Sequence, residues 1–302
     1  MTATAQYLQR AAGNRATASL VSRQAASPAR PSFESALNDA LQNLRADFGV
    51  PFRAGAFDSQ YWIRVADPGR FHWMLRLKAG VSAYDAIDEL VTKSATAWNL
   101  ECATAVQVAQ MYAQAKSQGK AAYDGRFTGR PFVLRFFESS GVRRKYFFDR
   151  ETKNGKWFAR YRKPGESKSR PHPVSSRWND ATILAVMPVG SRVMWRNQVL
   201  GPASGSSWRN ENTVKVGPDR FRGFPLFDSK PVPSQMIKLG MAAHQYASDH
   251  RSDPLIAGHA SNDDRIDVLL TAIESNPNQS ALAGLRAYVA ANVFLSEAVS
   301  FR

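Results

Sequence analysis

An α+β fold is predicted by two kinds of residue pattern that occupy separate stretches of this 302-residue chain. Apolar and polar residues alternate in residues 60–77 and again in 190–224, as they do in strands with one buried face. Apolar residues recur at helical spacing in residues 33–48 and in the stretch that begins at Cys102. Together the patterns predict antiparallel strands and several helices, one of which begins at Cys102.

The two ends of the chain differ from this central part. Residues 1–30 contain no acidic residue and are rich in Ala, Arg, Ser and Gln, which indicates a flexible leader over residues 1–31. Residues 32–240 hold most of the patterned stretches and are taken as the main domain. After Pro233 the pattern is mostly helical, so residues 241–302 are assigned to a C-terminal helical segment.

The main domain is expected to begin with a helix, a hairpin and a second helix. Residues 33–48 have an acidic residue early and predict a helix packed on the core. Residues 60–77 alternate on both sides of the turn sequence Asp67-Pro68-Gly69-Arg70, which predicts a hairpin. Ser82 followed by Asp85 resembles a capping box and predicts that a helix opens there.

The only cysteine of the chain, Cys102, stands where the next helix should begin. It shares one apolar stripe with Ala105, Val106, Ala109 and Ala113, so the thiol is expected to point toward the interior. A helix N-terminus carries unpaired N–H groups and partial positive charge, and a thiol placed there gains thiolate character and nucleophilicity. A buried cysteine that acts as a small hydrophobic residue fits the same position.

Residues 143–170 concentrate positive charge, with eleven Lys or Arg residues against three acidic ones. Two extended, aromatic-rich runs meet at Asn154-Gly155, a strong signal for a hairpin turn, and we treat residues 138–170 as a basic hairpin inserted in the main domain. Basic residues interleaved with aromatic ones can form a nucleic-acid surface. A solvated hairpin with a packed aromatic face, or a docking surface for an acidic substrate or a membrane, fits the same pattern.

The last third of the chain is predicted to contain strands and then helices. Residues 190–224 predict antiparallel strands, with Glu211 near the start of one of them. Ile266, Leu269, Leu270 and Ile273 recur at helical spacing and predict one helix. Residues 282–299 predict another helix.

The composition excludes several classes of site and protein. A single cysteine excludes an intrachain disulfide framework and makes a Cys-based zinc site implausible, and no metal or other cofactor is expected. No apolar run approaches the roughly 20 residues that cross a bilayer, and the N-terminus lacks an apolar signal core. We therefore expect a cytoplasmic protein without a transmembrane segment. The net charge of +15 favours anionic partners without identifying a reaction.

Three sequence blocks stand in a definite order. The first is Tyr61-Trp62-Ile63-Arg64-Val65-Ala66-Asp67-Pro68-Gly69, and the second is Glu101-Cys102-Ala103-Thr104-Ala105. The third is Trp208-Arg209-Asn210-Glu211-Asn212-Thr213-Val214, followed by residues 217–221. In composition and order these blocks resemble the bacterial spore-coat transglutaminases, which are protein-glutamine gamma-glutamyltransferases. The resemblance covers roughly residues 52–227.

This resemblance implies a papain-like, transglutaminase-like domain in which the Cys102 helix packs on an antiparallel sheet that bears Glu211. It also implies that no cofactor takes part and that Gln and Lys side chains of proteins are the substrates. Cys102 would form a thioester with a glutamine side chain and expel ammonia, and a lysine amine would then attack. Glu211 is the first candidate for the carboxylate that moves protons, and Glu101 is the second. Trp208 and Phe224 are candidates for the walls of the substrate channel. The family has a histidine where this chain has Phe224, so any role of that histidine is not carried over.

Residues 8–16, with the sequence Leu-Gln-Arg-Ala-Ala-Gly-Asn-Arg-Ala, form a short motif in the leader. The motif resembles one near the start of toxins associated with extracellular contractile injection systems. The resemblance implies an effector that a contractile injection apparatus delivers from the producing cell into a target cell. A solvated amphipathic turn fits the same residues.

Other functions fit parts of the sequence. If water attacked the thioester before an amine did, the protein would be a glutamine deamidase. A Cys-His peptidase would need a base among the five histidines, of which His259 has the most suggestive surroundings; the others are His72, His172, His244 and His250. A non-enzymatic nucleic-acid-binding protein would use residues 143–170, and its affinity would fall steeply with salt.

Overall fold

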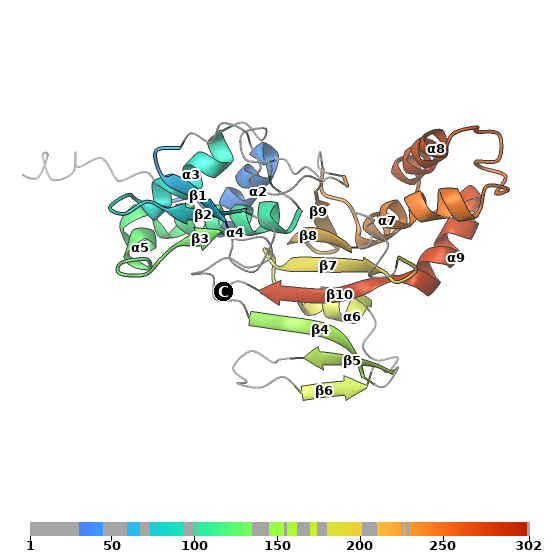
Figure 1. Ribbon diagram of the computed structural model, residues 1–302. Coiled ribbons are helices and arrows are strands. Elements are labelled where there is room, and N and C mark those ends of the chain that lie inside the picture. Colours follow the sequence, from blue (N-terminus) through green and yellow to red (C-terminus); the bar gives the residue numbers. More distant parts are fainter. Residues whose placement is uncertain are drawn as a thin grey trace, which may run out of the picture. The chain divides into compact units, whose positions relative to one another are not determined.

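The computed structural model describes residues 30–44, 59–66, 73–93, 100, 102–134, 145–153, 156–161, 170–173, 180–200, 210–224, 226–227 and 230–300. Ser32–Arg302 forms one compact unit, shown in Figure 1. It contains helices together with antiparallel sheets, which confirms the predicted α+β class. The motif at residues 8–16 lies outside the described residues.

The first part of this unit combines helices with a small sheet. Its elements are α2 (Phe33–Asn43), β1 (Trp62–Ala66), β2 (Trp73–Leu77), α3 (Ala83–Thr92), α4 (Cys102–Gln118), α5 (Lys120–Gly125) and β3 (Val133–Leu134). The three strands form an antiparallel sheet in the order β1-β2-β3. Buried side chains of these helices and strands form one cluster, which we call the first core. The predicted helix, hairpin pairing and second helix are confirmed, and the Ser82 hydroxyl accepts the Asp85 N–H at 3.1 Å.

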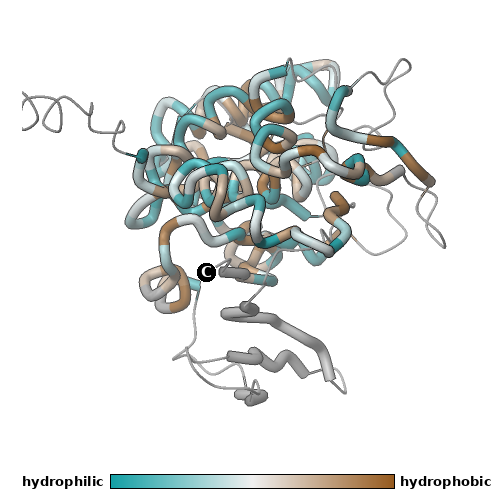
Figure 2. Tube along the Cα trace, turned by 90° about the vertical axis from the view of Figure 1, so that its left-hand side faces the viewer, coloured by the Kyte–Doolittle hydropathy of each residue, from teal (hydrophilic) through white to brown (hydrophobic). Residues whose placement is uncertain are grey.

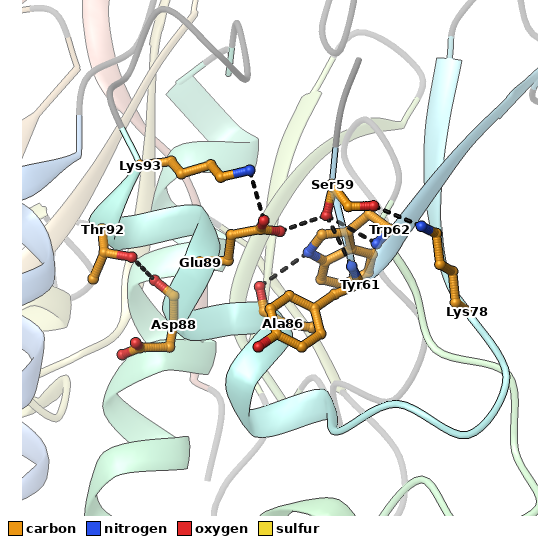
Figure 3. A network of polar contacts seen from close by, with 9 residues as sticks. All are labelled: Ser59, Tyr61, Trp62, Lys78, Ala86, Asp88, Glu89, Thr92 and Lys93. Carbon is orange, nitrogen blue, oxygen red and sulfur yellow. Dashed lines mark hydrogen bonds and ion pairs between the residues drawn. The ribbon is translucent and has the colours of Figure 1, made fainter.

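A buried polar network fixes the start of β1 to α3 (Figure 3). Ser59 Oγ accepts the backbone N–H groups of Tyr61 and Trp62 and donates to Glu89 Oε2 at 2.5 Å. Glu89 also pairs with Lys93 at 2.7 Å. The indole of Trp62 donates to the carbonyl of Ala86 in α3 at 2.9 Å. Because each buried polar group has a partner, the network can stabilise the small sheet against the helix.

The second part is built on a seven-stranded antiparallel sheet in the order β6-β5-β4-β10-β7-β8-β9. Its strands are β4 (Lys145–Lys153), β5 (Lys156–Tyr161), β6 (Arg170–Pro173), β7 (Arg192–Asn197), β8 (Asn210–Gly217), β9 (Arg220–Gly223) and β10 (Val293–Ser300). β4 and β5 pair with Lys153 opposite Lys156, which confirms the predicted hairpin pairing. The strands predicted between residues 190 and 224 are also confirmed.

The prediction of a helix over residues 282–299 is wrong in its second half. Helix α9 (Ala283–Asn292) ends at Asn292, and β10 follows as an inner strand between β4 and β7 (Figure 1). Leu295 and Ala298 of β10 are fully buried, and Glu297 forms an ion pair with Arg192 of β7. Pairing with strands on both sides and burial outweigh the local helical spacing. The segment 241–302 is therefore not helical throughout.

Several helices form a second core together with the large sheet. They are α6 (Asp180–Val186), α7 (Ser234–Asp249), α8 (Asn262–Ser275), the short 3₁₀ turn η3 (Ser280–Leu282) and α9. Helix α7 packs against β7, β9 and β10, and α8 packs against α7. The second core includes Trp195 of β7, Phe221 of β9, Ile237 of α7 and Leu269 of α8. The helix predicted around Ile266 and Ile273 is thus confirmed as α8. Figure 2 shows apolar and polar residues alternating within single helical turns, as expected of helices with one buried face.

Helix α4 reaches both parts of the unit. Every residue from Ala103 to Ala113 is buried, and the helix packs against α2, α3 and strand β8. Val214 of β8 belongs to the first core, together with Val106 and Ala109 of α4. The prediction that the Cys102 helix packs on an antiparallel sheet is therefore confirmed. In the part of the chain that the structure describes, no helix has the length and apolar character to cross a membrane.

Candidate active site around Cys102

The candidate nucleophile stands at the first residue of α4, as predicted. The residues that follow include five alanines between Ala103 and Ala115, and Ala is the strongest helix former. Cys102 is partly exposed, and it packs against the first core. A thiol here combines access from solvent with the partial positive charge of a helix N-terminus.

Two turns further along, Gln110 anchors α4 to the large sheet. Its side-chain Nε2 donates to the carbonyl of Gly190, just before β7, at 2.5 Å. Gly190 has a φ of 84°, and a Cβ there would come within 2.4 Å of the Phe33 ring. Only glycine fits this backbone conformation and this close approach. The contact fixes the position of α4 relative to β7 and β8.

Strand β8 brings a polar side chain to the sulfur. Asn212 is the third residue of β8 and only 2% exposed, and its Nδ2 donates to Cys102 Sγ at 3.4 Å. The Oδ1 atom of Asn212 is also buried and has no hydrogen-bond partner in the structure as described. Two other buried amide oxygens, Gln110 Oε1 and Asn262 Oδ1, also have no partner among the described residues, so Asn212 Oδ1 is distinguished by its place beside the sulfur.

Glu211 lies next to Asn212 but on the other face of β8. Successive side chains of a strand point to opposite faces. The Glu211 carboxylate is 1% exposed, and its Oε1 accepts the backbone N–H of Phe224 at 3.0 Å. A Cβ on Gly223 would lie within 3.4 Å of both Glu211 and Thr213, and Thr213 accepts the indole N–H of Trp195 in the second core. These contacts place Glu211 on the second-core face, whereas Asn212 faces α4.

The remaining predicted site residues are distributed as follows. Glu101 and Trp208 lie outside the described residues. Phe224 is 0% exposed and packs in the first core, which favours a packing role over a wall that a substrate contacts. The roles of Glu211, Glu101 and Trp208 stay predictions.

The histidines have separate surroundings. His244 on α7 lines a cavity of about 370 Å³ with Asp263 and Asp267 of α8, and burial lowers its pKa to about 4 although both carboxylates raise it. His250 stacks on Tyr246 at the end of α7, and His259 is exposed before α8. His172 is in β6, and His72 lies outside the described residues. Among the described residues, no group of three or more His, Cys, Asp or Glu is placed to hold a metal ion.

A larger cavity, of about 870 Å³, lies elsewhere. It is lined by the end of β2, the start of α3 and the segment before β3. The N-terminus of α3 is already occupied there, because Asp124 accepts the Tyr84 N–H and the Ser82 hydroxyl. Cys102 is not among the residues that line this cavity, so size alone does not identify the reactive site.

The comparison with protein families falls on the elements that carry the sulfur. Residues 34–136, about a third of the chain, match the family model for protein-glutamine gamma-glutamyltransferase. This segment is transglutaminase-like. It runs from α2 to β3 and includes Cys102, and it supports an acyltransferase of the transglutaminase type. The transglutaminase-like segment ends before β8, so the match does not extend to Glu211 or Asn212.

Among solved structures, the chain is similar to a transglutaminase from Geobacillus stearothermophilus without its C-terminal extension. The sequence identity is 20%, and the alignment covers 70% of this chain and 80% of that one, with a TM-score of 0.44. The sequence matches none of the curated proteins with which it was compared.

Sequence reasoning missed Asn212 as a site residue. It lay inside the third block, directly beside the chosen carboxylate. The available signal was the predicted strand itself, since neighbours on a strand face opposite sides, but a strand prediction does not tell which side faces α4.

Proposed function

We propose that the protein is a protein-glutamine gamma-glutamyltransferase in which Cys102 is the nucleophile. The observation that carries the proposal is the position of Cys102 at the start of α4, inside the transglutaminase-like segment, with its sulfur held by Asn212 of β8. A lone buried cysteine would not need a polar partner from a strand 110 residues away. The contact therefore favours a reactive thiol over a packing residue.

The proposed reaction has two steps. The Cys102 sulfur forms a bond to the carbon of a glutamine carboxamide, the C–N bond breaks, and ammonia leaves with the proton given up by the thiol. A lysine amine then forms a C–N bond to the same carbon, the C–S bond breaks, and one amine proton returns to the sulfur. Gln and Lys side chains of proteins are the substrates proposed from the family match. No cofactor takes part in this scheme.

For the proton carrier we keep Glu211 and Glu101 as the proposed carboxylates. Glu101 precedes the nucleophile directly in the chain. Glu211 is fully buried beside the strand position that contacts the sulfur, but its carboxylate is engaged with the Phe224 N–H on the opposite face. Support for Glu211 thus comes from the resemblance of its sequence block, and mutagenesis has to separate proton transfer from a supporting role.

A direct test is the incorporation of a small labelled amine into a glutamine-containing protein. We expect labelling by the wild-type protein and none by Cys102→Ala, a small change at a partly exposed position for which we expect only a small folding defect. Equal labelling by both proteins, or by neither, contradicts the proposal. Release of ammonia without incorporation of the amine would assign the protein as a glutamine deamidase instead.

Delivery as an injected effector is a separate proposal that rests on the motif at residues 8–16 alone. If the motif is a delivery signal, replacing its arginines should abolish transfer into target cells and leave amine incorporation by the purified chain unchanged. Loss of both transfer and amine incorporation, or of neither, contradicts it.

Nucleic-acid binding through residues 143–170 is a further candidate function. It would be supported by an affinity for nucleic acid that falls steeply with salt and persists in Cys102→Ala.

A further inference from the structure

We propose that Asn212 is a substrate-binding residue of this site, which holds the Cys102 sulfur through Nδ2 and accepts an N–H of the substrate carboxamide through Oδ1. The identity of the substrate as a primary carboxamide rests on the proposed function. The contact between Asn212 and the sulfur is observed in the structure and does not depend on that function. Neither the sequence blocks nor the family match assigns a role to this residue.

The amide nitrogen of Asn212 is a hydrogen-bond donor to the sulfur. Asn212 Nδ2 lies 3.4 Å from Cys102 Sγ and comes from a side chain that is 98% buried. A hydrogen bond to an ionised acceptor is stronger than one between neutral groups, and water does not compete well at a buried donor. The contact therefore favours the thiolate over the thiol, in addition to the effect of the α4 N-terminus.

The oxygen of the same amide, Asn212 Oδ1, is a hydrogen-bond acceptor without a partner among the described residues. Asn212 Oδ1 is buried and has no partner in the structure as described, whereas buried amide oxygens normally accept at least one hydrogen bond. Both ends of the amide are attached to one carbon, so a group that Oδ1 binds is held beside the sulfur. Because Oδ1 is covered in the free protein, a substrate N–H reaches it only when the groups that cover it move aside, and that N–H then supplies the missing donor.

The chemistry of this pair selects the ligand. A primary carboxamide carries N–H donors on the carbon that the sulfur must attack, so one hydrogen bond to Oδ1 brings that carbon to Sγ. A carboxylate would place a lone pair against Oδ1 and leave the acceptor unsatisfied, which sites of this kind reject strongly. The amine of the second step also offers N–H donors. Asn212 would thus favour glutamine over glutamate as acyl donor.

The test uses two alkylating probes that differ only in this group. Cys102 is the single cysteine of the chain, so alkylation by iodoacetamide or by iodoacetate reports on one sulfur. Leucine has a shape similar to that of asparagine but offers no hydrogen bond. In Asn212→Leu we therefore expect the rate of alkylation by iodoacetamide, divided by the rate with iodoacetate, to fall about five-fold, which corresponds to the loss of one hydrogen bond to the probe. The pH midpoint of alkylation should rise by about one unit because the sulfur loses a donor. Asn210→Ala, a partly exposed asparagine on the same strand, is the matched control and should keep both values.

A second variant keeps the proposal testable if Asn212→Leu does not fold. Asn212→Asp removes the donor but keeps an acceptor, so its midpoint should rise while its preference for iodoacetamide persists. If folded Asn212→Leu and Asn212→Asp both keep the wild-type ratio and midpoint, the proposal is overturned. Alkylation needs no turnover. A wild-type protein that fails to incorporate amines but shows the predicted changes would overturn the proposed function and leave the role of Asn212 standing.

Discussion

The two faces of strand β8 carry polar residues of two different kinds. On the face toward the second core, Glu211 accepts a backbone N–H, and Thr213 accepts the indole N–H of Trp195 at 2.9 Å. Lys215 on the same face donates to the carbonyls of Leu184 and Met187 at the end of α6. The polar groups on this face are engaged in holding the protein together.

The face toward α4 differs in one respect. Its buried polar residue, Asn212, uses one amide atom on a thiol and leaves the other without a partner in the described structure. Natural proteins tolerate an unsatisfied buried group mainly where function needs it. The comparison teaches that burial alone does not separate the polar residues that hold the protein together from the one that contacts the sulfur, because Glu211 and Asn212 are about equally buried.

The strongest test of this division concerns the two carboxylates. We expect Glu211→Ala to lose more amine incorporation than Glu101→Ala, and the double variant to lose nearly all of it. Glu211→Ala removes the acceptor of the Phe224 N–H as well as any proton carrier. Initial rates on folded protein, checked by circular dichroism, measure this. Unchanged turnover in the double variant would remove both residues from the mechanism.

Glu211→Gln separates support from proton transfer. The glutamine oxygen can still accept the Phe224 N–H, so we expect this variant to retain more activity than Glu211→Ala if the residue acts by holding the end of β9. Steady-state rates at several pH values provide the comparison. A Gln variant as inactive as the Ala variant would show that the charge itself is needed, and would assign proton transfer to Glu211.

A change on the second-core face should affect stability and leave the sulfur unaltered. Lys215 is buried, burial lowers its pKa, and its ammonium donates to two carbonyls of the chain. Lys215→Met leaves those carbonyls unpaired, so we expect a loss of about 1–3 kcal/mol in the free energy of unfolding, measured in urea. The alkylation rate of Cys102 per folded molecule should stay within about two-fold of the wild-type rate, because substitutions at sites that share no partner usually act independently. A large change in that rate would link the two faces.

The smallest expected effect is a pH dependence from His244. Burial lowers its pKa from 6.5 to about 4 in the folded state, so between these values the unfolded chain binds a proton that the folded chain does not. Stability should therefore fall as the pH is lowered from 6.5 to 4. His244→Gln should reduce this slope while Cys102 alkylation keeps its profile. Urea midpoints at several pH values test it, and an unchanged slope would contradict the assignment.

Much of this arrangement was accessible from the sequence. The helix that begins at Cys102, the strand that contains Glu211 and the basic hairpin follow from local periodicity, capping and turn residues, which act within a few positions. The third block identified the strand that meets the nucleophile helix. Local sequence patterns were sufficient to predict a helix or strand where the tertiary contacts of the segment favour the same secondary structure.

Two features could be found only in the three-dimensional structure. Strand β10 looked helical in isolation, and it is a strand because β4 and β7 pair with it on both sides. The choice between Glu211 and Asn212 depends on which face of β8 turns toward α4, and this is set by distant contacts such as that of Gln110 with Gly190. A shift of one residue reverses the faces of a strand, so spacing alone does not decide it.

The most direct measurement is the intact mass of the protein after incubation with a glutamine-containing peptide in the absence of an amine. We predict a covalent adduct on Cys102 with the mass of the peptide minus ammonia, and its release when a small amine is added. Failure to form an adduct under conditions in which the thiol is alkylated readily, or an adduct of the same mass on Cys102→Ala, would contradict it.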